Sequence, residues 1–178
     1  MRQLLILIHM VFLLGSAEVT SKKERGYFER FSVDTVLTKK PMITFRFDDG
    51  YQDILDSIAP LMKKYNGKGV VGIIASLPDK GLPQYLKWSG IDSLEKIYGW
   101  EIASHGYYHT GAMWDWMLDY IEALCSKDVL ESHGHRVSTY IAPKGSFDEF
   151  LDWMLKSHYV AAMATGSSFS RRFAPPVD

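Results

Sequence analysis

Three short polar clusters in this chain of 178 residues contain side chains whose types and spacing could do chemistry. They are the acidic pair Asp48-Asp49 before Gly50, the histidines His105 and His109 four residues apart, and the turn Pro143-Lys144-Gly145. Two imidazoles and one carboxylate form a zinc-type ligand set that leaves a coordination position open for water. The second carboxylate of the acidic pair could then accept a proton from the attacking water. The clusters therefore predict metal-assisted hydrolysis.

Neither half of this pattern is specific by itself. Two histidines four residues apart are more often a surface or core pair than a pair of metal ligands. An Asp-Asp-Gly sequence is most often a plain solvated turn. The prediction depends on the two occurring in one chain.

Alternating strand and helix patterns would position these clusters. Strands are expected over Met42–Phe47, Val70–Ala75, Glu101–Ser104, Val137–Ala142 and Tyr159–Thr165, and helices over Ile54–Met62, Ile91–Ile97, Met113–Glu131 and Phe147–Ser157. This alternation favours an α/β fold with a parallel sheet, open or closed into a barrel. Each polar cluster follows the end of an expected strand. Because α/β folds build their sites at the carboxyl ends of parallel strands, we expect the clusters to share one pocket.

In order and spacing, these motifs resemble those of the polysaccharide deacetylase family, the NodB-homology domain of the family-four carbohydrate esterases. The matching segments are Thr44–Gly50, Ser104–His109 and Ala142–Gly145, within a similarity that spans about Pro41 to Gly166. The first two segments are the specific part. The resemblance implies a distorted (β/α) barrel of the seven-stranded deacetylase type, with one strand fewer than the common eight.

The resemblance also implies a role for each site residue. Asp48 would be the catalytic base, and Asp49, His105 and His109 would bind one divalent metal, for which Zn²⁺ is expected. Pro143, Lys144 and Gly145 would form one wall of the substrate groove, with a backbone N–H such as that of Lys144 helping to hold the oxyanion. The implied activity is hydrolysis of N-acetyl or O-acetyl groups on a carbohydrate polymer, with a water activated by the metal as nucleophile.

Aromatic residues near the second motif are secondary candidates for substrate contact. Tyr107, Tyr108, Trp114 and Trp116 could stack on sugar rings, although aromatics at such spacings are more often core residues. Tyr108, which lies inside the motif itself, is the one assigned to substrate binding.

The chain also departs from the family pattern. Gly106 stands where members often carry Ser or Thr, Lys144 where they often carry an aromatic residue, and Ile141 where many place an Arg that orients the base. The later motifs, which supply a Trp-containing wall and an acid histidine, are not recognisable, so the barrel is expected to be incomplete at its C-terminus. Two alternatives stay open: a catalytically inactive or truncated carbohydrate-binding relative, and a different metal hydrolase such as a phosphoesterase. The lack of clustered Arg or Lys near the motifs argues against the second.

The N-terminal part shows a different pattern. Residues 1–17 combine Arg2, an apolar run and a small-residue cleavage site, which predicts a secretory signal peptide, with an uncleaved anchor as the alternative. Residues 18–40 are expected to form a polar leader and residues 41–178 the deacetylase domain. The protein is therefore expected to be secreted or extracytoplasmic, with no stable membrane span after cleavage.

Composition limits the partners. The formal net charge is −1, which disfavours nucleic acid as a partner and leaves an acetylated polysaccharide or oligosaccharide as the expected one. The single cysteine, Cys125, excludes an intramolecular disulfide and is expected to be a small buried side chain. The pair His133 and His135 is expected in a solvated loop at the opposite end of the sheet.

Overall fold

The computed structural model describes residues 43–164 and 171–172, all of which belong to one compact unit. The predicted signal peptide, residues 1–17, and the whole predicted polar leader, residues 18–40, lie outside the described residues, as does the predicted end of the last strand at Thr165. Export of the protein therefore stays a prediction.

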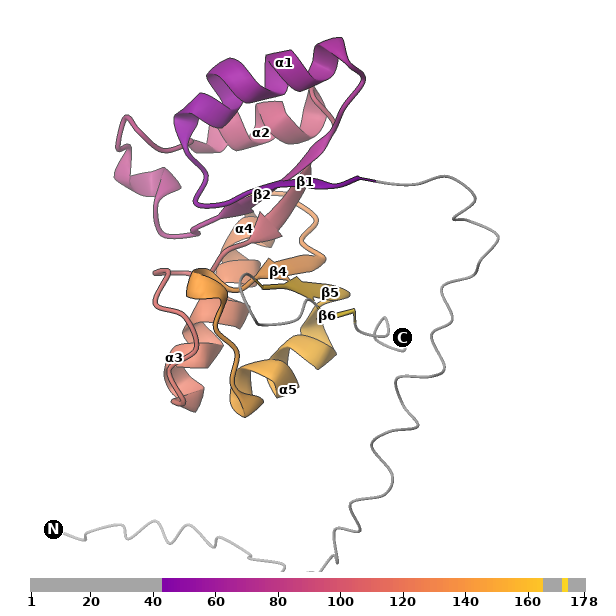
Figure 1. Cartoon of the computed structure of the whole chain (residues 1–178). Coiled ribbons are helices and arrows are strands. Elements are labelled where there is room, and N and C mark those ends of the chain that lie inside the picture. The colour runs from indigo at the N-terminus through magenta and orange to yellow at the C-terminus, as the bar shows by residue number, and fades with distance from the viewer. Residues whose placement is uncertain (1–42, 165–170, 173–178) are drawn as a thin grey trace, which may run out of the picture. The chain divides into compact units, whose positions relative to one another are not determined.

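One six-stranded sheet runs through the described unit in the order β1-β2-β3-β4-β5-β6. The strands are β1 (Phe45–Phe47), β2 (Gly69–Ile73), β3 (Glu101–Ser104), β4 (Thr139–Ile141), β5 (Ala161–Met163) and β6 (Arg171–Arg172). The first five are parallel to their neighbours, and β6 pairs antiparallel with β5. Because right-handed crossovers between strands in chain order all place their helices on one face, the sheet curls as in a barrel. The five parallel strands form a curled half-barrel, which confirms the prediction of an incomplete deacetylase-type barrel (Figure 1).

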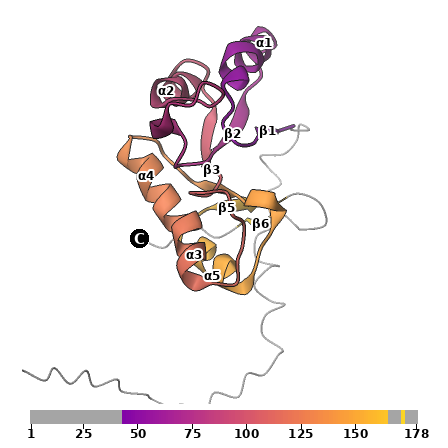
Figure 2. The ribbon, with the colours of Figure 1, turned by 90° about the vertical axis from the view of Figure 1, so that its left-hand side faces the viewer.

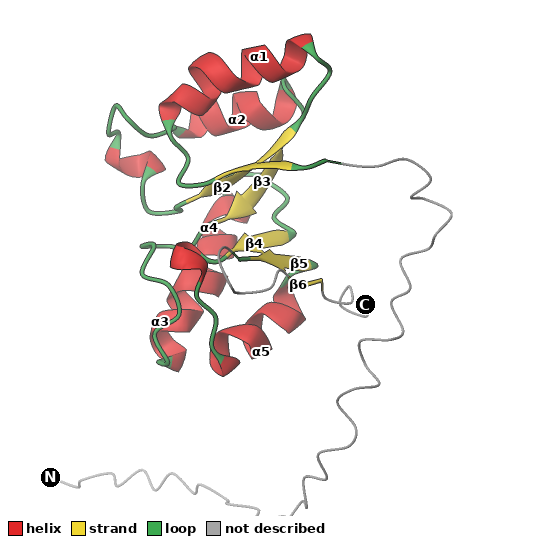
Figure 3. Ribbon diagram, in the orientation of Figure 1, coloured by secondary structure: helices red, strands yellow, loops and turns green. Residues whose placement is uncertain are grey.

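The helices follow the predicted alternation (Figure 3). They are α1 (Ala59–Lys64), α2 (Trp88–Lys96), α3 (Trp116–Tyr120), α4 (Ser126–Ser132) and α5 (Glu149–His158). A π-helical turn, Ile54–Ile58, leads into α1, and a second, Ile121–Cys125, joins α3 to α4 into the single long helix that the sequence predicts. In Figures 1 and 2 alike, α1 lies beside α2, and α3 lies beside α5. Within the described ranges, no helix combines the length and the hydropathy needed to cross a bilayer.

The core lies between the helices and the sheet. All five residues of β2 are buried, as expected for a central parallel strand covered on both faces. Phe47 of β1 stacks on Trp100 with ring centroids 5.2 Å apart. A Cβ added at Gly69 would lie 2.9 Å from the Trp100 ring, so only glycine lets β2 pass this aromatic pair. The packing fixes the strand end that leads directly into the acidic pair.

Candidate metal and catalytic site

Three predicted metal ligands converge in the structure. Oδ1 of Asp49 lies 3.3 Å from Nε2 of His105 and 3.4 Å from Nε2 of His109. The two imidazole rings meet edge to face with centroids 4.7 Å apart. Asp49 comes from the turn after β1, and both histidines follow β3, so the carboxyl ends of two strands supply the set. The ligand atoms of all three residues lie within 4.8 Å of one another.

Unusual backbone conformations are concentrated at this site. The described residues include five non-glycine residues with positive φ, and three of them are predicted site residues: Asp49 at 70°, His109 at 67° and Lys144 at 57°. Each such conformation costs about 1–3 kcal/mol and persists only where the surroundings enforce it. The fold therefore holds these three residues in orientations that the chain would not adopt by itself.

His105 is prepared to act as a metal ligand. Its ring is buried, and Nδ1 donates a hydrogen bond to the Ile141 carbonyl at 2.8 Å. Burial lowers the pKa of His105, which favours the neutral imidazole. With its proton on Nδ1, the ring directs the lone pair of Nε2 toward Asp49.

This arrangement fits a cation. Oδ1 of Asp49 is buried and has no hydrogen-bond partner among the described residues. It faces the Nε2 lone pair of His105, so two electron-rich atoms point at each other with nothing between them to balance their charge. A divalent ion would satisfy both, and one carboxylate with two imidazoles is a set that zinc accepts.

The loop that carries the histidines is fastened by Glu122, which the sequence analysis did not single out. This buried carboxylate accepts hydrogen bonds from the backbone N–H groups of Tyr108 at 2.9 Å and His109 at 3.1 Å. Gly106 has a φ of 80°, and a Cβ there would lie 2.1 Å from Oε2 of Glu122. Glu122 thus occupies the space that a Ser or Thr side chain would need, which explains the glycine at this position.

Replacing Glu122 by Gln is expected to lower zinc affinity about 10- to 100-fold, the usual effect of losing a group that orients a ligand. The amide keeps one acceptor oxygen but turns its NH₂ toward a backbone donor, so the His109 loop loses a charge-assisted bond. Competition with a fluorescent zinc chelator measures the affinity. Glu131→Gln, on the exposed surface of α4, is the matched control. Unchanged zinc affinity in Glu122→Gln would mean that the loop holds its shape without this carboxylate.

The predicted base, Asp48, is held by a residue that the sequence analysis also missed. Nε of Arg46 lies 2.9 Å from Oδ1 of Asp48, and Nη2 donates a hydrogen bond to Oδ2 at 3.0 Å. Nη1 of the same guanidinium donates to the Ala164 carbonyl just after β5, at 3.3 Å. Side chains two residues apart on a strand share a face, and this alternation is the signal that could have identified the pair.

The third motif lies beside the histidine loop. Pro143–Gly145 forms a short 3₁₀ turn with Lys144 exposed at its tip. Ser146, the next residue, accepts a hydrogen bond from the Ala112 N–H at 2.9 Å. The Ile141 carbonyl also accepts a hydrogen bond from His105, so two hydrogen bonds connect β4 and its following loop with the loop after β3. The structure therefore brings the third predicted cluster next to the second.

A pair of buried carboxyls holds the segment after the histidines. Asp119 accepts from the Met113 N–H at 3.1 Å, and Asp148 accepts from the Trp114 N–H at 2.7 Å. Burial raises the pKa of Asp119 from 3.8 to about 6; the Met113 N–H opposes the shift and the negative charge of Asp148 adds to it. Trp114 is two-thirds exposed and has a φ of 55°, so these carboxyls hold a large aromatic side chain in solvent in a strained conformation.

Because the folded state raises this pKa, protonation of Asp119 stabilises the protein. That contribution is complete below pH 3.8 and is lost as the pH rises to about 6. We expect the free energy of unfolding from urea titrations, measured with a chelator present, to fall across this window by about 1–3 kcal/mol. Asp119→Asn, which mimics the protonated acid, is expected to remove this slope, whereas exposed Asp128→Asn should keep it. An unchanged slope in Asp119→Asn would assign the titration to another group.

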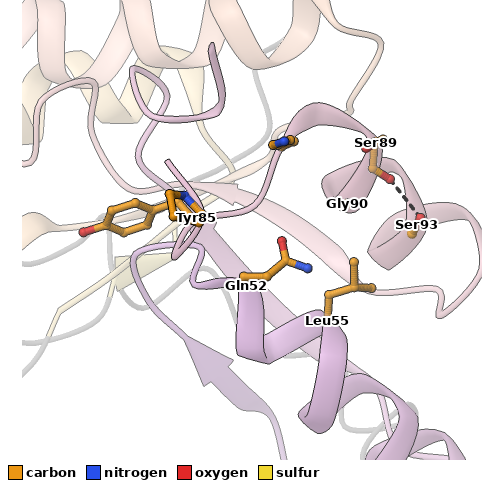
Figure 4. A pocket seen from close by; sticks show the side chains of 8 residues that line it. Gln52, Leu55, Tyr85, Ser89, Gly90 and Ser93 are labelled. Atoms are coloured by element: carbon orange, nitrogen blue, oxygen red, sulfur yellow. Dashed lines mark hydrogen bonds between the residues drawn. The ribbon is translucent and has the colours of Figure 1, made fainter. Parts of the chain in front are cut away.

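An open pocket of about 490 Å³ lies beside the acidic turn. Figure 4 shows Gln52 and Leu55 on one side of it and Ser89, Gly90 and Ser93 of α2 on another, with Tyr85 at its edge. Tyr85 stacks on Tyr51, with ring centroids 5.1 Å apart. The hydrogen bond with Tyr85 and the negative charge of Asp49, a predicted metal ligand two residues earlier, raise the pKa of Tyr51. The sequence analysis did not identify this aromatic pair.

The prediction of a solvated loop is wrong for His135. This side chain is buried, and its Nδ1 lies 2.7 Å from Oε2 of Glu95 on α2. Asp92, whose carboxylate pairs with Lys96, completes a second group of possible ligand atoms. Because Glu95 already provides a polar partner for the buried ring, the contact fixes the segment before β4 against α2. His133 is exposed, as predicted, and stacks on Trp88.

Residues 35–162 match the family model described as polysaccharide deacetylase. No functionally curated protein matches the sequence. Among solved structures, the chain is similar to the Streptococcus pyogenes deacetylase PplD in complex with acetate, with 22% identity, a TM-score of 0.63, and coverage of 68% of this chain and 54% of that one. It is also similar to the deacetylase domain of BpsB from Bordetella bronchiseptica, with 15% identity, a TM-score of 0.64, and coverage of 93% and 83%.

A third similar structure is a de-N-acetylase from Aggregatibacter actinomycetemcomitans, with 17% identity, a TM-score of 0.66, and coverage of 79% of this chain and 70% of that one. At these identities the structures establish a shared fold. The chain spans little more than half the length of the Streptococcus protein.

Proposed function

Because this chain belongs to the polysaccharide deacetylase family, we propose that it hydrolyses N-acetyl or O-acetyl groups on a carbohydrate polymer, using one divalent cation, Zn²⁺. The observation that carries the proposal is the convergence of Asp49, His105 and His109 beside a second, separately held carboxylate, Asp48. Three ligands and one free carboxylate are the parts that metal-assisted hydrolysis requires. The donor chemistry of the site supports a cation of this kind, and zinc is our proposal for its identity.

The reaction can be written with this chain's residues in every proton step. Asp48 takes a proton from water, whose oxygen attacks the acetyl carbon, and the bond from that carbon to the sugar nitrogen or oxygen then breaks. The proton on Asp48 passes to the leaving atom, which restores the base and gives a free amine or hydroxyl and acetic acid, and the acid then loses its own proton to the amine or to water to become acetate. When bound by Asp49, His105 and His109, the cation would supply Lewis acidity toward water and the acetyl oxygen. The exposed Lys144 turn would offer its backbone N–H to the developing oxyanion.

We place the polymer along the aromatic residues that flank these groups. Tyr108 is more than half exposed beside His109, and Tyr51, two residues after Asp49, stacks on Tyr85, which lines the pocket of Figure 4. Flat aromatic faces beside polar groups such as Gln52 suit sugar rings, which present C–H faces and hydroxyl edges. The Streptococcus structure contains acetate, the product that such a reaction releases.

Acetate release from N- and O-acetylated oligosaccharides of increasing length tests the proposal. The zinc-loaded protein should release acetate, and Tyr85→Ala should raise KM more for long substrates than for short ones, with Tyr65→Ala, at an exposed tyrosine that does not line the pocket, as control. If the protein takes up one zinc ion and binds sugar but releases no acetate, it is a carbohydrate-binding relative instead. A phosphoesterase is disfavoured because the guanidinium of Arg46, which a phosphate group would need as a partner, is already paired with Asp48.

We also propose that residues 1–17 direct export, as their sequence pattern predicts. N-terminal sequencing of the exported protein should then begin at Glu18. A chain that keeps Met1 and stays membrane-attached would favour the uncleaved anchor.

A further inference from the structure

We infer that Arg46 is the residue that positions the catalytic base, holding the Asp48 carboxylate in one orientation and tying it to the end of β5. This inference rests on the proposed function. It assigns a role to a residue of β1 that is neither a predicted metal ligand nor part of the third-motif loop.

The guanidinium uses all three of its nitrogens. Nε and Nη2 contact the two oxygens of Asp48 at 2.9 and 3.0 Å, and Nη1 donates to the Ala164 carbonyl at 3.3 Å. Two contacts to one carboxylate fix the plane of that group as well as its place. Each oxygen keeps a further lone pair, so Asp48 can still accept a proton from water.

The third contact anchors the pair to a distant part of the sheet. β1 and β5 are separated by β2, β3 and β4, so the chain curls enough for one arginine to reach from the first strand to the end of the fifth. Arg46 and Asp48 therefore depend on the curvature of the half-barrel for their orientation. A flat sheet with the same strands would place the Ala164 carbonyl out of reach.

Ile141, at the third-motif position where many family members carry arginine, offers no charged side chain for this task. Ile141 is fully buried against Val70 and Ala103, and its carbonyl accepts from His105. Its aliphatic side chain belongs to the core and carries no charge. Arg46, which approaches Asp48 from its own strand, supplies the missing positive group.

Arg46 also separates the roles of two adjacent carboxylates. Asp48 and Asp49 are neighbours in sequence, and two such charges near one cation would compete for it. The guanidinium pairs with Asp48, while Asp49 faces the two histidines. The arrangement leaves one carboxylate for the cation and one for the proton.

Kinetics of Arg46→Ala and Arg46→Lys test this role. A misplaced base is expected to lower kcat about 100-fold in Arg46→Ala, with KM and zinc affinity within about twofold of wild type. Arg46→Lys, which contacts only one oxygen, should recover part of the loss, and added guanidinium ion should partly rescue Arg46→Ala. In the background of Asp48→Asn, Arg46→Ala should cause no further loss of kcat, because the group it positions is already disabled.

Three outcomes would overturn the inference. They are a wild-type kcat in Arg46→Ala, an equal loss in the Asp48→Asn background, or a loss that neither lysine nor guanidinium recovers although thermal melting shows a folded protein. Arg136→Ala, at an exposed position, is the control. If the wild-type protein itself releases no acetate from any substrate while binding zinc, the proposed function fails first, and the role of Arg46 fails with it.

Discussion

Replacing Asp48 by Asn is expected to lower kcat for acetate release by about 10²–10⁴-fold, the range over which a general base contributes. The amide has the shape of the carboxylate but cannot take a proton from water. Zinc affinity should stay within about twofold, because the proposed ligand atoms belong to Asp49, His105 and His109. Steady-state acetate release and zinc competition measure the two quantities separately.

Asp53→Asn is the matched control, since Asp53 is an exposed residue of the same segment. A parallel fall of zinc affinity and kcat in Asp48→Asn would make Asp48 a ligand rather than the base. Wild-type kcat with intact zinc binding would place the base on a residue other than Asp48.

The second large effect is expected at the ligand carboxylate. Asp49→Asn should weaken zinc binding by at least about 100-fold, since the loss of a group that merely orients a ligand already costs 10- to 100-fold. Asn is chosen because it tolerates the positive φ of 70° at this position, so the variant removes charge without adding backbone strain. Zinc should raise the melting temperature of the wild-type protein and leave that of Asp49→Asn nearly unchanged at the same concentration.

Both measurements are needed for that variant. A lower kcat with wild-type zinc affinity would contradict the ligand assignment and indicate that Asp49 takes part in proton transfer. Asp48→Asn serves as the internal control, because it removes a neighbouring negative charge and leaves the ligand set in place.

The fold was predictable because its signals are local. Apolar runs ending in Asp-Asp-Gly, in Ser-His-Gly and in Ala-Pro-Lys-Gly marked three strand ends, and parallel strands bring such ends to one edge of the sheet. Element bounds shifted by a few residues: α2 begins at Trp88 rather than Ile91, because Lys87 is the last residue with extended backbone before the helix. The C-terminal strands of a complete deacetylase-type barrel were not predicted, because no sequence motif for them is recognisable.

The supporting residues could not be predicted in the same way. Glu122 acts on backbone groups 13 and 14 residues earlier in the chain, and it stands in a helix whose sequence indicates only an apolar face. The role of Arg46 has no local signal of its own, because its contact with the Ala164 carbonyl, 118 residues later, depends on the curl of the whole sheet. His135 is buried by a helix 40 residues away, which no local pattern reveals.

Zinc titration of the metal-stripped protein, with acetate measured in the same samples, tests the central claim most directly. The proposed function predicts no acetate release without metal, a rise in rate that ends at one zinc ion per chain, and loss of that rise in Asp49→Asn. Acetate release that does not depend on added metal, or one bound zinc ion with no acetate released from any acetylated oligosaccharide, would contradict it.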